Sequence, residues 1–258
     1  TSNGQAPRWT DEMDERLRRY RKEADLCAAF IAAVRPAWTA YAETAGWDIL
    51  LVAADGTQIG VQAKLKFNMK VLGQAIDGSW MAWSAEGPDF RAVLVPDSGG
   101  EDICAALGLQ LIHARGDGRS FEPNISSKPD RWGYLDGGRW HFWNPVRRHK
   151  LPDFVPDVVA GASGPVQLTR WKVAALRVFA RLEIRGHVTR KDFRDLGIDA
   201  RRWLGPGVSW LQPGTAPGTY IAGERPSLAA QHPEVWPQVL TDERKKLAAA
   251  GDLMEAAA

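Results

Sequence analysis

The sequence predicts an α/β protein with a mixed β-sheet flanked by helices, followed by a smaller domain of helices and one hairpin. Helix-like and strand-like segments alternate as far as residue 114, and this alternation favours parallel or mixed pairing with helices covering the sheet. A stretch rich in Pro and Gly at 151–165 then separates two regions of regular pattern. The 258 residues, 45% of them hydrophobic and 25% charged, suffice for one large packed domain or two ordinary ones.

The first predicted element is a helix over residues 10–34. Thr10 is a suitable N-cap, and the acidic residues that follow it suit the positive end of a helix dipole. Apolar residues then recur at spacings of three and four, which gives the helix one buried face. Pro36 ends this helix, and a short strand is predicted over 37–42.

Two strands are predicted next, at 47–53 and 58–64, joined by an Asp-Gly turn. Asp48 lies near the start of the first strand, while Gln62 and Lys64 lie two apart at the end of the second. Strand side chains alternate between faces, so Gln62 and Lys64 share one face. A carboxylate, an amide oxygen and an ammonium group can therefore converge at one sheet edge. Such a set can bind a divalent metal and activate water beside a phosphate.

The remaining elements before the Pro/Gly-rich stretch also follow from periodicity and turn residues. We expect a helix over 68–83, a buried strand over 91–95, a helix over 101–107, a strand over 109–112 and a hairpin over 132–143. The predicted order is therefore helix, three strands, helix, strand, helix, strand.

The second region begins with a predicted helix over 168–184 that Gly186 ends. Shorter helices are predicted over 189–196 and 199–204, and a hairpin over 208–222. Three helices and a hairpin in this order resemble a winged helix-turn-helix. The predicted division of the chain is 10–150 for the first domain, 151–165 for the linker, 166–240 for the winged-helix-like domain and 241–258 for a flexible tail.

The first domain resembles the PD-(D/E)XK nuclease superfamily. Asp48 matches the metal-binding Asp of that superfamily, and Gln62-Ala63-Lys64 matches its (E/Q)xK tripeptide. The Gln form is similar to Mrr-type restriction endonucleases, in which QxK replaces ExK. The resemblance covers roughly residues 12–114 and includes the order of elements. It implies a restriction-endonuclease-like core.

The resemblance also implies roles for individual residues. Asp48, Gln62 and the backbone carbonyl of Ala63 would hold Mg²⁺, with Mn²⁺ as a substitute. Either Glu43 or Glu23 would complete the metal shell. Glu43 is the preferred one of the two, and we count it with Asp48, Gln62 and Lys64 among the expected catalytic residues. Lys64 would orient water and offset negative charge in the transition state.

Candidate DNA contacts lie in both regions. Beyond the QxK strand, Lys66 and Lys70 would contact phosphates, and Gln74 resembles a helix Gln that some relatives use near DNA. In the second region we expect Trp203 in the core and DNA contacts from Arg190, Lys191, Arg194, Arg201 and Arg202. The net charge of +2 is too small to indicate nucleic acid binding by itself.

The function that the sequence predicts is a magnesium-dependent deoxyribonuclease, an endonuclease that hydrolyses phosphodiester bonds through a metal-activated water. DNA is the expected partner, while a homodimer and a protein partner in a larger complex both stay open. The alternative is a non-catalytic DNA-binding or assembly protein on the same scaffold, in a phage, mobile-element, defence or repair setting. The phosphate-loop and dinucleotide-binding glycine patterns, zinc-ligand spacing and the GxSxG nucleophile motif are all missing from the sequence.

The two cysteines and the hydropathy pattern predict the compartment. Cys27 and Cys104 lie in apolar helical patterns and are expected as buried free thiols in a reducing cell interior. The sequence contains no run of 18 apolar residues and no recognisable signal peptide. We therefore expect a soluble, cytoplasmic protein with no membrane partner.

Overall fold

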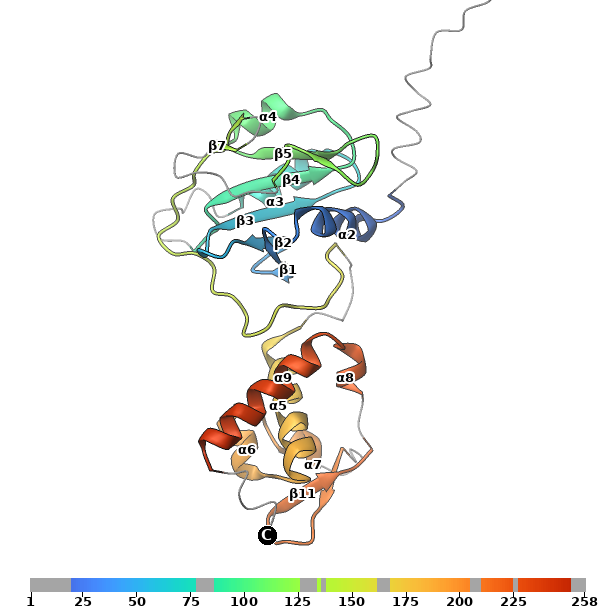
Figure 1. The fold of residues 1–258 in the computed structure, drawn as a ribbon, viewed down its shortest axis with the longest axis vertical. Coiled ribbons are helices and arrows are strands. Elements are labelled where there is room, and N and C mark those ends of the chain that lie inside the picture. Colours follow the sequence, from blue (N-terminus) through green and yellow to red (C-terminus); the bar gives the residue numbers. More distant parts are fainter. Residues whose placement is uncertain are drawn as a thin grey trace, which may run out of the picture. The chain divides into compact units, whose positions relative to one another are not determined.

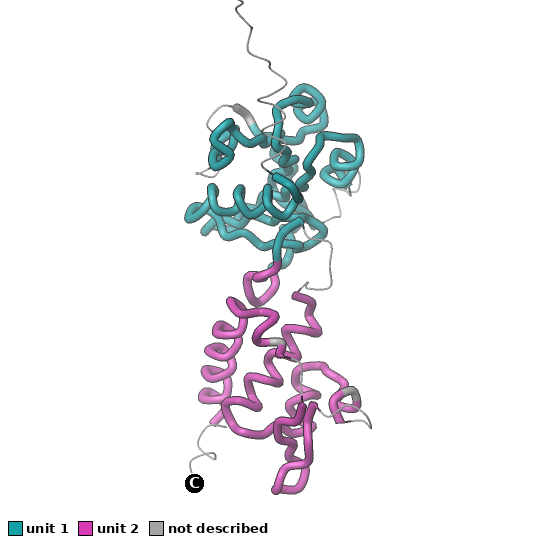
Figure 2. The backbone as a smooth tube through the Cα atoms, turned by 90° about the vertical axis from the view of Figure 1, so that its right-hand side faces the viewer, with its two compact units in different colours: residues 1–151, 159–164 teal, residues 152–158, 165–258 magenta. Residues whose placement is uncertain are grey.

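The chain forms two compact units (Figure 2). The structure, a computed structural model, describes residues 20–77, 86–125, 134–135, 138–161, 168–204, 210–224 and 227–251. The first unit comprises Thr1–Leu151 and Val159–Gly164, and the second comprises Pro152–Val158 and Pro165–Ala258. The expected linker at 151–165 is therefore divided between the two units.

A mixed sheet of six strands forms the centre of the first unit (Figure 1). The strands follow one another in space in chain order, and they are β1 (Thr39–Thr44), β2 (Trp47–Val52), β3 (Gln58–Ala63), β4 (Phe90–Val95), β5 (Gln110–Ala114) and β6 (Phe121–Glu122). The pairs β1–β2 and β2–β3 are antiparallel, β3–β4 and β4–β5 are parallel, and β5–β6 is antiparallel. The mixed α/β class that the sequence predicts is confirmed.

Helices connect the parallel strands of this sheet. The helices of the first unit are α2 (Glu23–Val34), α3 (Met69–Ile76) and α4 (Glu101–Ala106). The Asn68 side chain accepts the N–H of Val71 and caps α3, which leads from β3 to β4. The predicted hairpin is present as β7 (Tyr134–Leu135) paired with β8 (Gly138–Arg139).

The first described helix is shorter than the sequence predicts. The predicted Thr10 cap and residues 10–19 lie outside the described residues, and residues 20–22 are not helical. Lys22 is extended, and its N–H donates to the Asp25 carboxylate 3.1 Å away. The helix therefore begins at Glu23, because Asp25 satisfies a backbone donor at that point.

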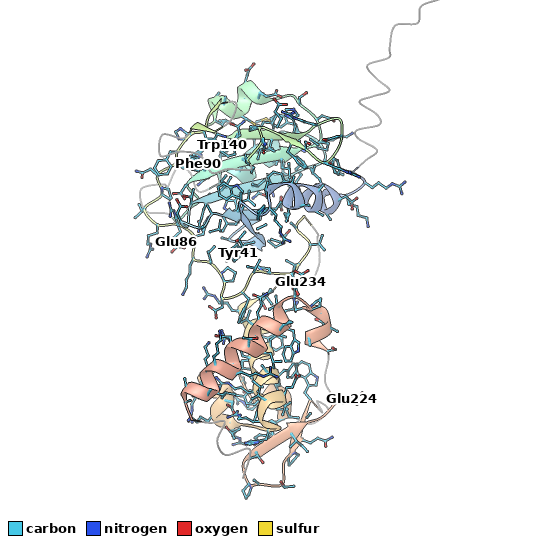
Figure 3. The ribbon with its side chains drawn as sticks, in the orientation of Figure 1. Tyr41, Glu86, Phe90, Trp140, Glu224 and Glu234 are labelled. Atoms are coloured by element: carbon cyan, nitrogen blue, oxygen red, sulfur yellow. The ribbon has the colours of Figure 1, made fainter. Side chains whose placement is uncertain are left out.

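The core of the first unit requires a small residue on β3. Every residue of β3 and β4 is buried, as expected for strands covered on both faces. A Cβ on Gly60 would lie 2.4 Å from the Trp47 ring, so the indole packs directly on the glycine backbone. At another point of the sheet, Phe90 on β4 packs edge-to-face on Trp140, with ring centroids 6.1 Å apart (Figure 3).

The second unit combines helices with a small sheet. Its elements are α5 (Arg170–Arg185), β9 (Val188–Thr189), α6 (Arg190–Asp195), α7 (Arg201–Leu204), β10 (Leu211–Pro213), β11 (Thr219–Ala222), α8 (Leu228–Gln231) and α9 (Val235–Ala249). The strands are ordered β10-β11-β9. The predicted helices and hairpin are present, and β9 is an additional strand that pairs with β11.

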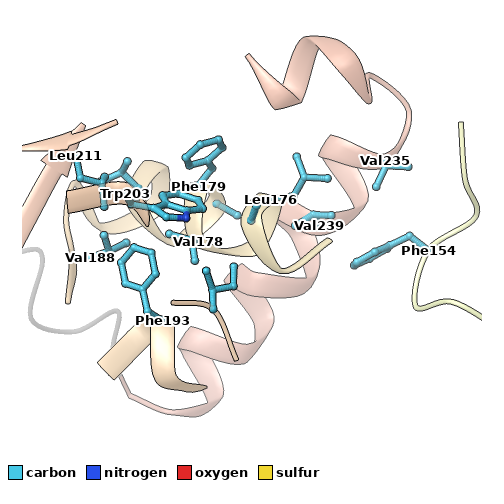
Figure 4. Close-up of a cluster of buried hydrophobic side chains, with 14 residues drawn as sticks. Phe154, Leu176, Val178, Phe179, Val188, Phe193, Trp203, Leu211, Val235 and Val239 are labelled. Carbon is cyan, nitrogen blue, oxygen red and sulfur yellow. The ribbon is translucent and has the colours of Figure 1, made fainter. Parts of the chain in front are cut away.

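Trp203 lies at the centre of the core of the second unit (Figure 4). Its side chain is fully buried, which confirms the core assignment. The rings of Phe179, Phe193 and Trp210 lie 4.9 to 5.2 Å from it, centroid to centroid. These contacts fix α7 against α5 and α6.

We expected a flexible tail from residue 241, but α9 continues through Ala249. Leu247 is buried, and the fully buried Glu243 accepts hydrogen bonds from Arg177 and Arg181 on α5. A buried carboxylate is tolerated when charged donors satisfy it. The charge-rich end of the sequence therefore holds α9 onto α5, a role that its composition does not reveal.

Candidate metal and DNA site

The first feature of the candidate site is the contact between Asp48 and the end of β3. Asp48 Oδ2 accepts the backbone N–H of Ala63 at 2.7 Å. The predicted aspartate and the predicted QxK tripeptide are therefore adjacent, although Asp48 lies 15 positions earlier in the sequence. The bond uses one acceptor position of the carboxylate and leaves its other oxygen to further ligands.

Lys64, directly after β3, pairs with the first helix. Its Nζ lies 2.6 Å from Glu23 Oε2, and the two side chains are 19% and 30% exposed. An ammonium group has three donors, so the Glu23 contact leaves donors for water or phosphate. Sequence reasoning ranks Glu23 below Glu43, yet Glu23 is the acid in direct contact with Lys64.

Glu43 and Asp48 lie near each other on the neighbouring strands β1 and β2. The paired residues Ala42–Ile49 and Thr44–Trp47 flank these two acids on either side. Glu43 Oε1 also accepts the backbone N–H of Gly161 at 2.8 Å. The two acids proposed as partners of Asp48 therefore have different neighbours: a lysine ammonium for Glu23 and a backbone amide for Glu43.

The Gln62 side chain is 4% exposed, and its Nε2 donates to the carbonyl oxygen of Gly46 at 2.8 Å. This bond ties the end of β3 to the turn between β1 and β2. Gln62 and Lys64 thus have separate partners, and Gln62 is the more buried of the two. The amide oxygen of Gln62 is the atom that would have to serve as a metal ligand.

Four charged groups influence each other at this place. Burial raises the pKa of Asp48, while the Ala63 N–H and Lys64 act in the opposite direction. Burial likewise raises the pKa of Glu43, which the bond from Gly161 counteracts. Burial, and then the charges of Asp48, Glu23 and Glu43, raise the pKa of the Cys27 thiol. A site that makes carboxylates costly to ionise favours a bound cation.

Cys27 lies within reach of these charges, and sequence reasoning did not place it there. Both cysteines are buried and free, as expected. The signal in the sequence is the spacing of four between Glu23 and Cys27, which puts both on one face of α2. This spacing could therefore have indicated, from the sequence alone, that Cys27 lies on the same side of the helix as Glu23.

The donor set fits a hard divalent cation that keeps several waters. Among the described residues, no three His, Cys, Asp or Glu side chains are already grouped as metal ligands. Magnesium commonly takes only one or two carboxylates from a protein and fills its other positions with water and phosphate oxygens. Asp48 with Glu43 or Glu23, together with neutral oxygens from Gln62 and Ala63, meets that requirement.

The predicted DNA contacts of the first unit lie outside its core. Lys66 lines a cavity of about 180 Å³ together with Phe67, Asp97 and Ser98, beyond the ends of β3 and β4. Lys70 and Gln74 are exposed on α3. These side chains lie on or before the helix that follows the QxK strand.

The second unit exposes a group of basic residues on its short helices. Lys191 and Arg194 on α6 are exposed, and the Arg190 guanidinium donates from Nε to the Tyr220 hydroxyl at 3.1 Å. The Arg201 side chain is 91% exposed and pairs with Asp199. The side chain of Arg202 lies outside the described residues.

Comparison with known proteins identifies no relative. No family model, curated protein sequence or solved structure matches the chain. In the part of the chain that the structure describes, none of the helices has the length and apolar character needed to span a bilayer.

Proposed function

We propose that this chain is a metal-dependent DNA endonuclease that hydrolyses phosphodiester bonds. The observation that carries the proposal is the adjacency of Asp48, the Ala63 amide, Lys64 and Glu23 at the end of β3. The order α2, β1–β3, α3, β4 supports the resemblance to the PD-(D/E)XK superfamily. Fold and residues thus favour the same reaction class.

Each group would have a distinct task in the reaction. Asp48 and one further acid would hold Mg²⁺ or Mn²⁺, helped by the oxygens of Gln62 and Ala63. The bound cation would stabilise charge on the phosphate and lower the pKa of a nearby water. Lys64 would orient the attacking water and offset the charge that builds up on the phosphate oxygens. One water is consumed and one P–O bond breaks, leaving a phosphomonoester and a hydroxyl.

The second unit would position the first on DNA. The sequence α5, β9, α6, α7, β10, β11 supports the winged-helix-like assignment. Thr189 and Asp192 form a capping box at the start of α6, which fixes the helix that carries Lys191 and Arg194. Exposed Lys and Arg on a short helix suit phosphate contacts and base contacts in the major groove.

A second candidate function is DNA binding or assembly without catalysis. The observation that favours it is the burial of Gln62, whose amide group is bonded to Gly46. A neutral and engaged side chain at this position reduces the negative charge available to a metal. In that case the first unit would serve as a scaffold, and the basic helices of the second would carry the function.

Cleavage of supercoiled, linear and single-stranded DNA with Mg²⁺ or Mn²⁺ tests the proposal. We expect metal-dependent cutting by the wild type and at least about a 100-fold loss in Lys64→Ala, the scale of removing one charge-stabilising group. Lys245→Ala, which removes the same charge from an exposed position of α9, is the matched control and should keep activity. Duplex binding without cutting by the wild type would instead support the second candidate.

A further inference from the structure

A short segment returns to the first unit after the chain has entered the second. The chain joins the second unit at Pro152, and Val159–Gly164 belong to the first unit again. Within this segment we name residues 159–161 the strap. Ala160 is 2% exposed, and Gly161 lies against Glu43 and Cys27 of the first unit, so the strap is not a free connection.

The strap touches α2 at the candidate site. A Cβ built on Gly161 would lie 3.1 Å from Cys27 Sγ and 3.2 Å from the Glu23 carbonyl carbon. Gly161 also has φ +71°, a backbone conformation that side chains with a Cβ seldom adopt. The close approach of the strap to α2 therefore depends on glycine at this position.

The amide of Gly161 engages one of the two carboxylate oxygens of Glu43. Its N–H donates to Glu43 Oε1 at 2.8 Å, and Asp48, on the neighbouring strand β2, is close enough for its charge to act on Glu43. Carboxylates that bind metals are usually held by an outer hydrogen bond that fixes their orientation. The bond leaves Glu43 Oε2 available as a ligand.

We propose that Gly161 is a positioning residue that holds the Glu43 carboxylate ready to bind a divalent cation together with Asp48. This inference rests on the proposed function, because it presupposes a cation at Asp48. It names Glu43 as the acid that completes the site and gives the strap a task in the first unit. Binding is reciprocal, so a bound cation also strengthens the attachment of the strap.

Binding of Mn²⁺ to the full-length chain tests the positioning role. Free Mn²⁺ is measured by electron paramagnetic resonance during titration of the wild type, Gly161→Ala and Gly197→Ala. Gly197 shares a positive φ of +67° but has open space around it, so this control carries the backbone strain without the contacts. We expect about tenfold weaker binding in Gly161→Ala, as for loss of an outer-shell partner, and wild-type binding in Gly197→Ala.

Amide hydrogen exchange at Gly161 in metal-free protein gives a second readout that does not depend on cation binding. Glu43→Ala removes the acceptor and should speed exchange about tenfold, whereas Glu43→Gln keeps an oxygen acceptor and should exchange nearly as the wild type does. Unchanged exchange in Glu43→Ala would overturn the inference.

Failure of the proposed function can be distinguished from failure of the positioning role of Gly161. A wild type that binds no Mn²⁺ and cuts no DNA overturns the proposed function, and this inference with it. A wild type that binds Mn²⁺ while Gly161→Ala binds it equally well or better overturns only the positioning role of Gly161.

Discussion

Lys64 Nζ lies 2.6 Å from Glu23 Oε2, joining the end of β3 to the first turn of α2 across 41 positions of sequence. The pair places an ammonium group and a carboxylate beside Asp48, whose pKa both charges influence. Glu23 is therefore neutralised by a neighbour, whereas Glu43 accepts a hydrogen bond from a backbone amide. This difference separates the two acids proposed to complete the site.

We predict that Glu43→Gln weakens Mn²⁺ binding more than Glu23→Gln does. Glu43 would lose a ligand charge, with an expected cost of at least about tenfold in affinity. Glu23 is already paired with Lys64, so its charge contributes less to a cation nearby. Isothermal titration of both variants gives the comparison. A larger loss in Glu23→Gln would identify Glu23 as the ligand.

Asp48→Asn should stabilise the first unit at neutral pH. Burial raises the pKa of Asp48, so the folded protein holds this proton more tightly than the unfolded chain. Stability contributed by this group is therefore lost as the pH rises from the unfolded pKa through the folded pKa. Thermal unfolding at pH 7.5 and pH 4 should show a gain in Tm for Asp48→Asn that shrinks at the lower pH. An equal gain at both pH values would contradict this linkage.

Glu243→Ala should strongly destabilise the second unit. The buried carboxylate accepts from Arg177 and Arg181, and its removal leaves both guanidinium groups short of a partner. Breaking a buried ion pair typically costs about 3–5 kcal/mol. Arg244→Ala, at the next and exposed position of α9, should change stability by less than about 0.5 kcal/mol. Urea unfolding followed by circular dichroism compares the two, and equal midpoints would show that the network contributes little.

The basic residues of α6 should contribute to duplex binding through phosphates. Lys191→Ala and Arg194→Ala together should weaken binding of mixed-sequence duplexes and make the salt dependence shallower, by about 1 in slope for each phosphate that is no longer neutralised. The control is Arg244→Ala with Lys245→Ala, which removes the same charge from exposed positions of α9. Fluorescence anisotropy at several salt concentrations gives the slopes. Identical slopes for both double variants would assign the effect to net charge alone.

Both thiols should resist alkylation in the folded protein. Burial, followed by the charges of Asp48, Glu23 and Glu43, raises the pKa of Cys27, and burial raises the pKa of Cys104 to about 11. Because the thiolate is the reactive form, iodoacetamide at pH 8 should modify neither cysteine until the chain unfolds. Mass spectrometry counts the modified cysteines with and without urea. Rapid labelling of Cys27 under native conditions would mean that the site opens readily.

Local patterns predicted most of the elements. The strands at 47–52 and 58–63 and their antiparallel pairing are confirmed, because an Asp-Gly turn between two apolar runs specifies a hairpin within a few residues. The start of α2 and the length of α9 were not predicted. The first depends on Asp25 satisfying the Lys22 amide, and the second on arginines 62 and 66 positions away from Glu243.

The candidate site likewise has one part that the sequence predicted and one part that it did not. The sequence indicated that Asp48 and the QxK tripeptide would meet, since both belong to one hairpin. The contact of Gly161 with Glu43 joins residues 118 positions apart and involves only a backbone amide on the glycine side. Side-chain types carry no sign of such a contact, so the strap could be recognised only in the folded chain.

The packing of Trp47 on Gly60 predicts how relatives of this chain vary. Because the indole occupies the space where a side chain on residue 60 would lie, residue 60 can become larger only if residue 47 becomes smaller or shifts. A relative with alanine or a larger residue at position 60 should carry a smaller residue in place of Trp47. Gly60 lies two residues before Gln62, so paired changes at 47 and 60 would help to align distant sequences at the QxK strand.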